Sequence, residues 1–226
     1  MEKLWVFRLT RLLASALVRI YFRMEIRGLE NVPLEGAMIV APNHVSYMDP
    51  IWVSSPLKRP LRYMTWDRMT GLPLLGALMR AYGAFPVNIE SASGDRAALR
   101  QSLEQLRSGG GLMIFPEGSR SRDGKLLSFK PGVIRLALAA EVPIVPVSII
   151  GGYDAYPPHY IFPRPYKIKV IYHEPIKLSP PSNNSQLKEY MREETEKLRS
   201  LIASELPLEA IPLEKERAQV SAGSGT

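Results

Sequence analysis

The stretch Ala37-Met-Ile-Val-Ala-Pro-Asn-His-Val-Ser-Tyr-Met-Asp-Pro50 decides how the chain is organised. Its first five residues are apolar and the run stops at Pro42, which predicts a short buried strand. Asp49 followed by Pro50 is typical of a helix start, with the acid at the N-cap and the proline at the first helical position. His44 therefore falls in a loop between a strand and a helix.

His44 and Asp49 in this loop suggest a catalytic base. Five positions along a regular helix would point the two side chains about 140° apart, so they can meet only across a turn. A carboxylate at one imidazole nitrogen fixes the tautomer, while the other nitrogen accepts a proton from a substrate hydroxyl. The simpler interpretation is that Asp49 only caps the helix and His44 only bonds a nearby carbonyl.

Four sequence blocks, in order, resemble those of the glycerolipid acyltransferases, the 1-acylglycerol-3-phosphate acyltransferase family. The first is the His-x4-Asp block itself, and the others are Gly83-Ala-Phe-Pro-Val-Asn88, Phe115-Pro-Glu-Gly-Ser-Arg-Ser121 and Val142-Pro-Ile-Val-Pro-Val147. The resemblance covers about half of the chain. It implies acyl transfer in phospholipid biosynthesis, from acyl-CoA or an acyl carrier protein to the free hydroxyl of 1-acylglycerol-3-phosphate, with His44 as base and Asp49 as its orienting partner. We expect no cofactor and no metal.

The third block predicts a phosphate site. Gly118 permits a tight backbone, and Ser119 adds a hydroxyl beside Arg120. Arg120 offers a planar fork to phosphate oxygens, and Glu117 is expected to hold that fork or a substrate hydroxyl. Lys130 belongs to a basic rim near the same site. The alternative is a Pro-Glu-Gly turn with a solvated arginine.

The second block departs from the family pattern, because Ile89 stands where an arginine for the acceptor phosphate is common. A different acceptor, such as another lysophospholipid or an aminoacyl lipid, is therefore an alternative, and so is a lipid-binding surface protein without activity. Ser46 and Ser119 are possible nucleophiles, but no Gly-x-Ser-x-Gly elbow surrounds them, which disfavours a hydrolase.

Composition limits the remaining classes of function. The 226 residues fit one domain, and the absence of cysteine excludes disulfides, thiol nucleophiles and cysteine-ligated metals. The net charge of +7 comes mainly from residues 31–185, which hold seventeen Lys and Arg against eleven acids. This balance suits an anionic membrane or a polyanionic thioester carrier. Nucleic acid is not expected as a partner, because no supporting motif occurs.

The N-terminal segment predicts a helix that lies on a membrane surface. Residues 4–22 are mostly apolar, but Arg8, Arg11 and Arg19 leave no charge-free run of the roughly 20 residues that a crossing needs. The arginines cluster on one side of a helical wheel, as in an interfacial helix. We therefore expect a monotopic or peripheral protein on the cytoplasmic face of the cell membrane. The alternative is a helix packed on the core of this domain.

The remaining pattern alternates strands and helices. It predicts an α/β fold, a single domain with a mixed, largely parallel sheet flanked by helices, preceded by an N-terminal amphipathic membrane-associated segment. We divide the chain into an interfacial helix at 1–22, the acyltransferase domain at 23–206 and a disordered tail at 207–226. Residues 72–79 form either an acyl-chain groove or a core helix. Pro146 suggests an edge strand or a bulge.

Overall fold

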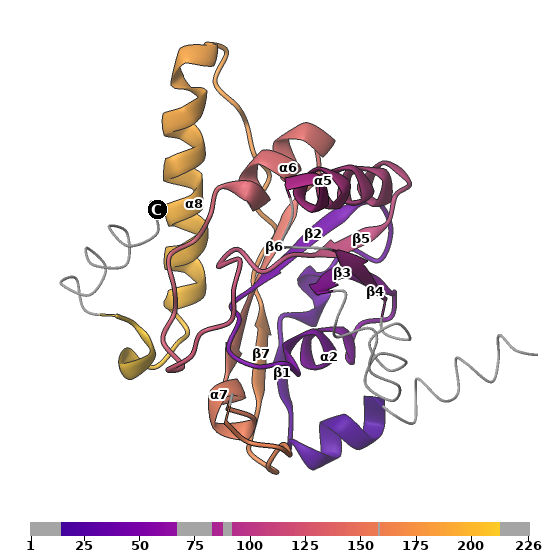
Figure 1. Cartoon of the computed structure of the whole chain (residues 1–226), viewed down its shortest axis with the longest axis vertical. Coiled ribbons are helices and arrows are strands. Elements are labelled where there is room, and N and C mark those ends of the chain that lie inside the picture. Colours follow the sequence, from indigo (N-terminus) through magenta and orange to yellow (C-terminus); the bar gives the residue numbers. More distant parts are fainter. Residues whose placement is uncertain (1–14, 67–82, 88–91, 158, 213–226) are drawn as a thin grey trace, which may run out of the picture.

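The computed structural model describes residues 15–66, 83–87, 92–157 and 159–212 (Figure 1). Residues 15–21 are helical. The strands are β1 (Glu25–Arg27), β2 (Met38–Pro42), β3 (Leu61–Trp66), β4 (Ala84–Val87), β5 (Gly111–Met113), β6 (Ile144–Ile150) and β7 (Lys169–Tyr172). The helices are α2 (Asp49–Ser54), α5 (Ala92–Arg107), α6 (Gly132–Ala140), α7 (Gly152–Ala155) and α8 (Leu187–Ala203), with 3₁₀ turns at Leu29–Asn31, Asn184–Gln186 and Leu208–Ala210.

The strands of these ranges form one sheet of seven, in the order β1-β7-β6-β2-β5-β3-β4. Every neighbouring pair is parallel except β6 and β7. The predicted α/β domain with a mixed, largely parallel sheet is thus confirmed. The predicted membrane helix lies mostly in residues 1–14, outside the described residues. Within the described ranges, no helix combines the length and apolar character that a bilayer crossing requires.

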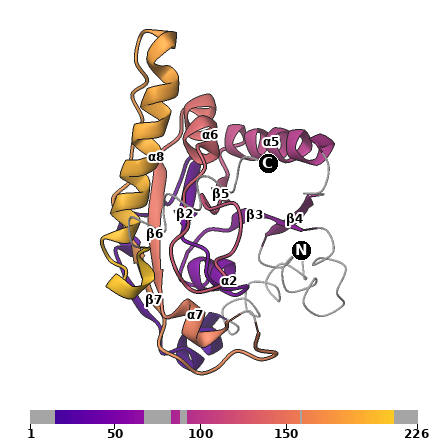
Figure 2. The ribbon, with the colours of Figure 1, turned by 60° about the vertical axis from the view of Figure 1, so that its left-hand side comes forward.

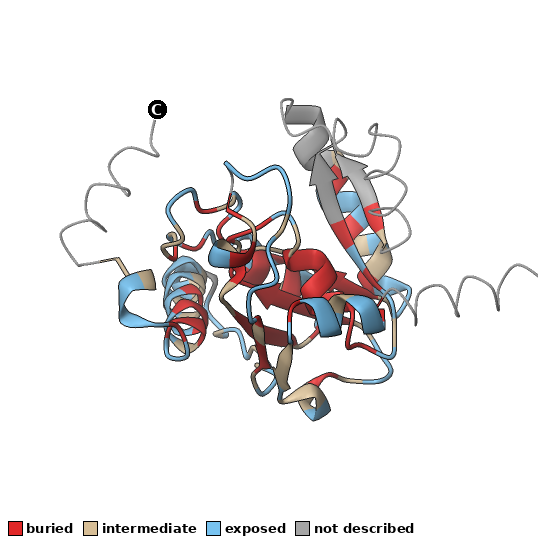
Figure 3. Cartoon of the chain, turned by 90° about the horizontal axis from the view of Figure 1, so that it is seen from below, coloured by how far each residue is buried: buried red, intermediate tan, exposed pale blue. Residues whose placement is uncertain are grey.

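Strand β2 is buried on both faces because helices cover both sides of the sheet. Met38 and Val40 point into one core cluster, which includes Trp52 of α2. The intervening Ile39 and Ala41 point into a second cluster beneath α6 and α8. Figure 3 shows buried residues concentrated along the sheet and exposed residues on the outward sides of the helices. An unbroken apolar run is what a strand buried on both faces requires.

The strands β2, β5 and β6 are parallel, so their carboxyl ends meet at one edge of the sheet. The His44 loop leaves β2 there, the Phe115–Ser121 segment follows β5, and α7 follows β6 (Figure 2). Ligands of open α/β sheets bind at this edge. The His44 loop and the Phe115–Ser121 segment, which are about 70 residues apart in the sequence, are thereby brought together.

The prediction that Pro146 marks an edge strand is wrong, whereas the alternative of a bulge agrees with the strand pairing. Strand β6 lies between β2 and β7, and Pro146 pairs in register with Ala41. The carbonyl of Pro146 accepts a hydrogen bond from the His173 amide (2.9 Å), just before the first antiparallel pair, Val147 with Tyr172. Past Pro146 the antiparallel pairing resumes at Ile144 with Ile176, so three residues on the β6 side are matched by four on the other strand. Proline is tolerated at such a bulge because the regular ladder is interrupted where its N–H is missing.

The predicted disordered tail does not begin at residue 207. The 3₁₀ turn Leu208–Ala210 follows α8, and the Ala210 carbonyl accepts a hydrogen bond from the Leu126 amide (2.8 Å). Ile211 packs against the core cluster beneath α8. The chain therefore stays attached to the domain through residue 211, and residues 213–226 lie outside the described part.

Candidate active site

His44 and Asp49 are in direct contact across the loop. His44 Nδ1 lies 2.7 Å from Asp49 Oδ2, and the same oxygen accepts hydrogen bonds from the amides of Val45 (2.7 Å) and Ser46 (2.8 Å). The Asp49 side chain is fully buried, whereas the imidazole is 20% exposed. The carboxylate therefore fixes the ring through Nδ1, and Nε2 is the nitrogen left for a substrate.

Asp49 does not cap α2 as predicted. Met48 occupies the N-cap position, and Asp49 is the first helical residue with Pro50 after it. The carboxylate turns back onto the preceding loop, where two amides and one imidazole nitrogen converge on it. Three donors to Oδ2 offset part of the loss of hydration that burying a carboxylate entails, while Oδ1 is buried without a hydrogen-bond partner among the described residues. Local turn geometry thus provides both an oriented base and a helix start.

The Phe115–Ser121 segment holds the backbone of His44 from both sides. The His44 amide donates to Glu117 Oε1 (2.6 Å), and the His44 carbonyl accepts a hydrogen bond from the Ser121 amide (2.9 Å). The Phe115 ring also stacks on the imidazole, with centroids 3.8 Å apart. The position of the candidate base is therefore set by a segment that is more than 70 residues away in the sequence.

Glu117 differs from the prediction that it holds the fork of Arg120 or a substrate hydroxyl. Its side chain is buried, and its second oxygen accepts a hydrogen bond from the Leu127 amide (2.9 Å). Both carboxylate oxygens are thus engaged with main-chain N–H groups. Burial raises the pKa of Glu117 to about 7. Its position makes it a structural clamp between the His44 loop and the segment that leads to α6.

Arg120 lies beside the His44 loop. Its guanidinium carbon sits 3.4 Å from the centre of the Tyr47 ring, and Tyr47 belongs to the stretch between His44 and Asp49. The buried Nε of Arg120 has no hydrogen-bond partner among the described residues. A guanidinium held on an aromatic face beside the candidate base is suited to an anionic ligand.

Lys130 crosses the turn at Gly118. The glycine has a positive φ of 71°, and a Cβ there would lie 3.1 Å from Lys130 Cδ, Cε and Nζ. A residue with a side chain would be strained in this conformation and crowded by the lysine. Ser119 is exposed next to Gly118. Gly118, Ser119 and Arg120 therefore lie in one turn beside the His44 loop, and Lys130 packs against that turn.

Two residues with positioning contacts were not predicted. The Asn43 side chain is buried, donates to the Ile149 carbonyl (3.1 Å) and accepts from the Ile149 amide (2.7 Å), which ties the His44 loop to β6. Arg199 of α8 donates to the Leu127 carbonyl (3.2 Å), next to the Glu117 clamp. A buried polar residue directly after a strand must find hydrogen-bond partners, so the sequence could have predicted a positioning role for Asn43. No sequence pattern indicated the contact of Arg199.

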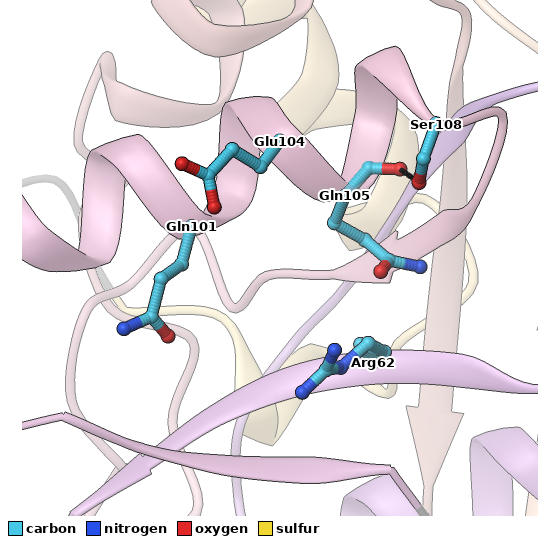
Figure 4. A pocket seen from close by; sticks show the side chains of 5 residues that line it. All are labelled: Arg62, Gln101, Glu104, Gln105 and Ser108. Carbon is cyan, nitrogen blue, oxygen red and sulfur yellow. Dashed lines mark hydrogen bonds between the residues drawn. The ribbon is translucent and has the colours of Figure 1, made fainter.

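A polar cavity of about 370 Å³ lies elsewhere in the domain (Figure 4). Side chains of β3, of α5 and of the residue that follows α5 line it: Arg62, Gln101, Glu104, Gln105 and Ser108. Gln105 donates to the carbonyl of Gly111, the first residue of β5, so the cavity faces the amino ends of the strands. It contains none of the residues around His44.

Two sequence predictions concern residues outside the described ranges. They are the missing phosphate contact at Ile89 and the acyl-chain groove or core helix at residues 72–79. Across the ranges that are described, no group of three or more His, Cys, Asp or Glu side chains is placed to hold a metal ion.

Comparisons with known proteins agree with the family resemblance of the four sequence blocks. The Acyltransferase family model matches residues 23–150. The chain is 30% identical over 144 residues to the chloroplastic 1-acyl-sn-glycerol-3-phosphate acyltransferase LPAT1 of Arabidopsis thaliana, covering 63% of this chain and 40% of the relative. It is 27% identical over 181 residues to the 1-acyl-sn-glycerol-3-phosphate acyltransferase of Borreliella burgdorferi, covering 80% and 69%. The matched part thus spans well under two thirds of the plant relative and about two thirds of the bacterial one.

A solved structure shares the fold. The 1-acyl-sn-glycerophosphate acyltransferase PlsC from Thermotoga maritima superposes with a TM-score of 0.64 at 29% sequence identity, covering 83% of this chain and 76% of that one. The family match extends over more than half of the chain and includes the His44 loop, the Phe115–Ser121 segment and strand β6. This chain belongs to the Acyltransferase family.

Proposed function

We propose that this protein transfers an acyl group from acyl-CoA, or from an acyl carrier protein, to the free hydroxyl of 1-acylglycerol-3-phosphate. The observation that carries the proposal is the His44–Asp49 pair at 2.7 Å, clamped by the segment that also presents Arg120. A partly exposed imidazole with a buried carboxylate behind it and a cation beside it suits deprotonation of a hydroxyl on a phosphate-bearing substrate.

In the proposed reaction, His44 Nε2 takes the proton of the acceptor hydroxyl as its oxygen attacks the thioester carbonyl carbon. Asp49 stabilises the imidazolium that forms. The tetrahedral intermediate then expels the thiolate, which receives the proton from His44, and the products are phosphatidate and the free thiol. Transfer is direct, without an acyl-enzyme, and Glu117 contributes by fixing the backbone of His44.

Arg120 and Lys130 would bind the phosphate of the acceptor. Support comes from the packing of Lys130 against the turn that carries Arg120, and from the position of Arg120 over Tyr47, which belongs to the His44 loop. Among the described residues, Arg120 forms no ion pair with a carboxylate, so its charge is not neutralised within the protein. A dianionic phosphate would supply that partner.

Because the acceptor is a lipid, we also propose that the protein works as a monotopic or peripheral protein on an anionic membrane, at its cytoplasmic face. The net charge of +7 supports attraction to anionic lipids. A cysteine-free chain is compatible with a reducing compartment.

A second candidate acceptor follows from Ile89, which replaces a cation that the related proteins commonly carry after the second block. With one cation fewer, the acceptor would be another lysophospholipid or an aminoacyl lipid, while the chemistry at His44 stays the same. The distinction concerns the headgroup only.

The test is release of free thiol from acyl-CoA in the presence of a panel of lysolipids. Release with lysophosphatidate alone supports the first proposal, and release only with other acceptors selects the second. If no acceptor releases thiol from either acyl-CoA or an acyl-loaded carrier protein, and vesicle binding is intact, the protein binds lipids without activity.

A further inference from the structure

Two exposed apolar segments lie side by side at one end of the molecule. In the helix at 15–21, Leu17 is 67% and Ile20 is 74% exposed. In the loop after α7, Ile161 is 82% and Phe162 is 76% exposed. Large apolar side chains so exposed in two adjacent segments indicate a surface that meets an apolar partner.

Hydrogen bonds join the two segments. Tyr21 Oη donates to the Pro163 carbonyl (2.9 Å), and Arg23 Nη2 donates to the Pro165 carbonyl (3.2 Å). The Ile168 amide donates to the Phe22 carbonyl (3.0 Å) just before β7 begins. Figures 1 and 2 both show the helix beside this loop at the lower end of the molecule.

This surface is at the same sheet edge as His44. Strand β1 begins directly after the helix and runs parallel to β7, which is antiparallel to β6. Both segments therefore lie where β6 and its parallel neighbour β2 end, and the His44 loop leaves β2 at that point. Tyr156 makes a direct link, because its carbonyl accepts from Ser46 Oγ and its hydroxyl donates to the Ile161 carbonyl (each 3.2 Å).

The charges around this surface favour an anionic partner. The sequence of residues 15–23 and 156–167 contains Arg19, Arg23, Arg164 and Lys167, and neither segment contains an acid. The flanking acid Glu25 is paired with Lys167 at 2.8 Å, and Asp154 is exposed. Exposed Tyr160 and Tyr166 flank Ile161 and Phe162. This arrangement suits an anionic lipid surface, because apolar side chains can enter the acyl-chain region while the surrounding tyrosines and cations stay among the headgroups.

We propose that Leu17, Ile20, Ile161 and Phe162 form a docking surface that inserts into an anionic lipid bilayer and holds the His44 loop at headgroup level. The loop at 159–166 is then a second membrane contact beside the N-terminal helix. The proposal rests on the proposed function only in taking a membrane lipid as the acceptor. Acceptor molecules would reach His44 from the bilayer without passing through water.

The absence of cysteine allows a site-specific test in the full chain. An environment-sensitive fluorophore is attached to Phe162→Cys and, as control, to Leu34→Cys. Leu34 is 66% exposed but lies between β1 and β2, at the opposite edge of the sheet. With phosphatidylglycerol vesicles, the emission at position 162 should shift to the blue and that at position 34 should not. No shift at 162, or equal shifts at both positions, overturns the proposal.

A second test separates docking from catalysis. The double variant Ile161→Ser with Phe162→Ser should bind these vesicles at least about tenfold more weakly than wild type, while Leu34→Ser binds normally. Its kcat/KM should fall with vesicle-embedded acceptor and stay unchanged with a short-chain, monomeric acceptor. Unchanged vesicle binding, or equal loss with both acceptors, contradicts docking.

The two proposals fail in different ways. If wild-type protein releases no thiol with any acceptor, the proposed function is lost, and the fluorescence and vesicle-binding measurements still decide whether the docking surface exists. If thiol release is normal but neither measurement distinguishes position 162 from position 34, only the docking surface is lost.

Discussion

Asp49 Oδ2 lies 2.7 Å from His44 Nδ1, although the two residues are five positions apart and only Asp49 belongs to a helix. The turn between them points two main-chain amides at the same oxygen. The carboxylate is thereby fixed independently of the histidine, and the imidazole takes its orientation from it. A base built this way is oriented before any substrate arrives.

Asp49→Asn should lower kcat by about 10²- to 10⁴-fold with little change in the KM for the acceptor. An amide oxygen still accepts hydrogen bonds from the loop but cannot stabilise the imidazolium by charge. Steady-state thiol release measures both constants, and Asp154→Asn, at an exposed carboxylate, serves as the control. A variant with at least one tenth of the wild-type kcat would show that Asp49 is only structural.

Arg120→Ala should raise the KM for a phosphate-bearing acceptor about tenfold or more, and Arg120→Lys should recover only part of it, because a lysine lacks the planar fork. The KM for acyl-CoA should stay close to the wild-type value. Arg122→Ala is the matched control, since Arg122 is an exposed arginine two positions along the chain. Equal acceptor KM values in Arg120→Ala and wild type would assign the phosphate to other residues.

Glu117 should make stability depend on pH. Burial raises its pKa from 4.5 to about 7, so the folded protein binds this proton more tightly than the unfolded chain does. The unfolding free energy should therefore fall as pH rises from about 4.5 to about 7, by at most about 3 kcal/mol.

Denaturant unfolding at several pH values checks this, with Glu117→Gln as the variant that lacks the ionisable group. Its unfolding free energy should be less dependent on pH in that window, whereas Glu30→Gln, at an exposed position, should follow the wild type. Parallel pH profiles for wild type and Glu117→Gln would mean that Glu117 does not titrate between these values.

Asn43→Leu should destabilise the domain by about 2 to 4 kcal/mol, because it leaves the amide and carbonyl of Ile149 buried without their partner. It should also lower kcat, since the loop that carries His44 loses its attachment to β6. Gln186→Leu, at an exposed amide side chain that makes no capping hydrogen bond to α8, should change stability by less than about 0.5 kcal/mol. An Asn43→Leu protein as stable and active as wild type would rule out this attachment.

The sequence predicted those parts of the fold that depend on short-range pattern. The apolar run at 37–41 corresponds to β2, and the predicted alternation of strands and helices corresponds to the observed largely parallel sheet. Of the two alternatives for Pro146, the bulge agrees with the structure and the edge strand does not, because the register next to β6 shifts by one residue inside the sheet, which only the strand pairing reveals.

The site was predictable only where its residues are close in sequence. His44 and Asp49 meet within one turn, so their spacing and the family pattern predicted their contact. The contact of His44 with Glu117 spans 73 positions, and that of Arg199 with Leu127 spans 72. Contacts of this kind depend on how β2, β5 and α8 pack, so no local pattern indicates that Glu117 binds a backbone amide instead of Arg120.

Thiol release by His44→Ala with a short-chain, monomeric acceptor tests the central claim most directly. The account predicts a kcat about 10³-fold or more below wild type, together with normal vesicle binding and unfolding, while His159→Ala, at an exposed histidine, stays near the wild-type rate. A His44→Ala protein that turns over at close to the wild-type rate would contradict it.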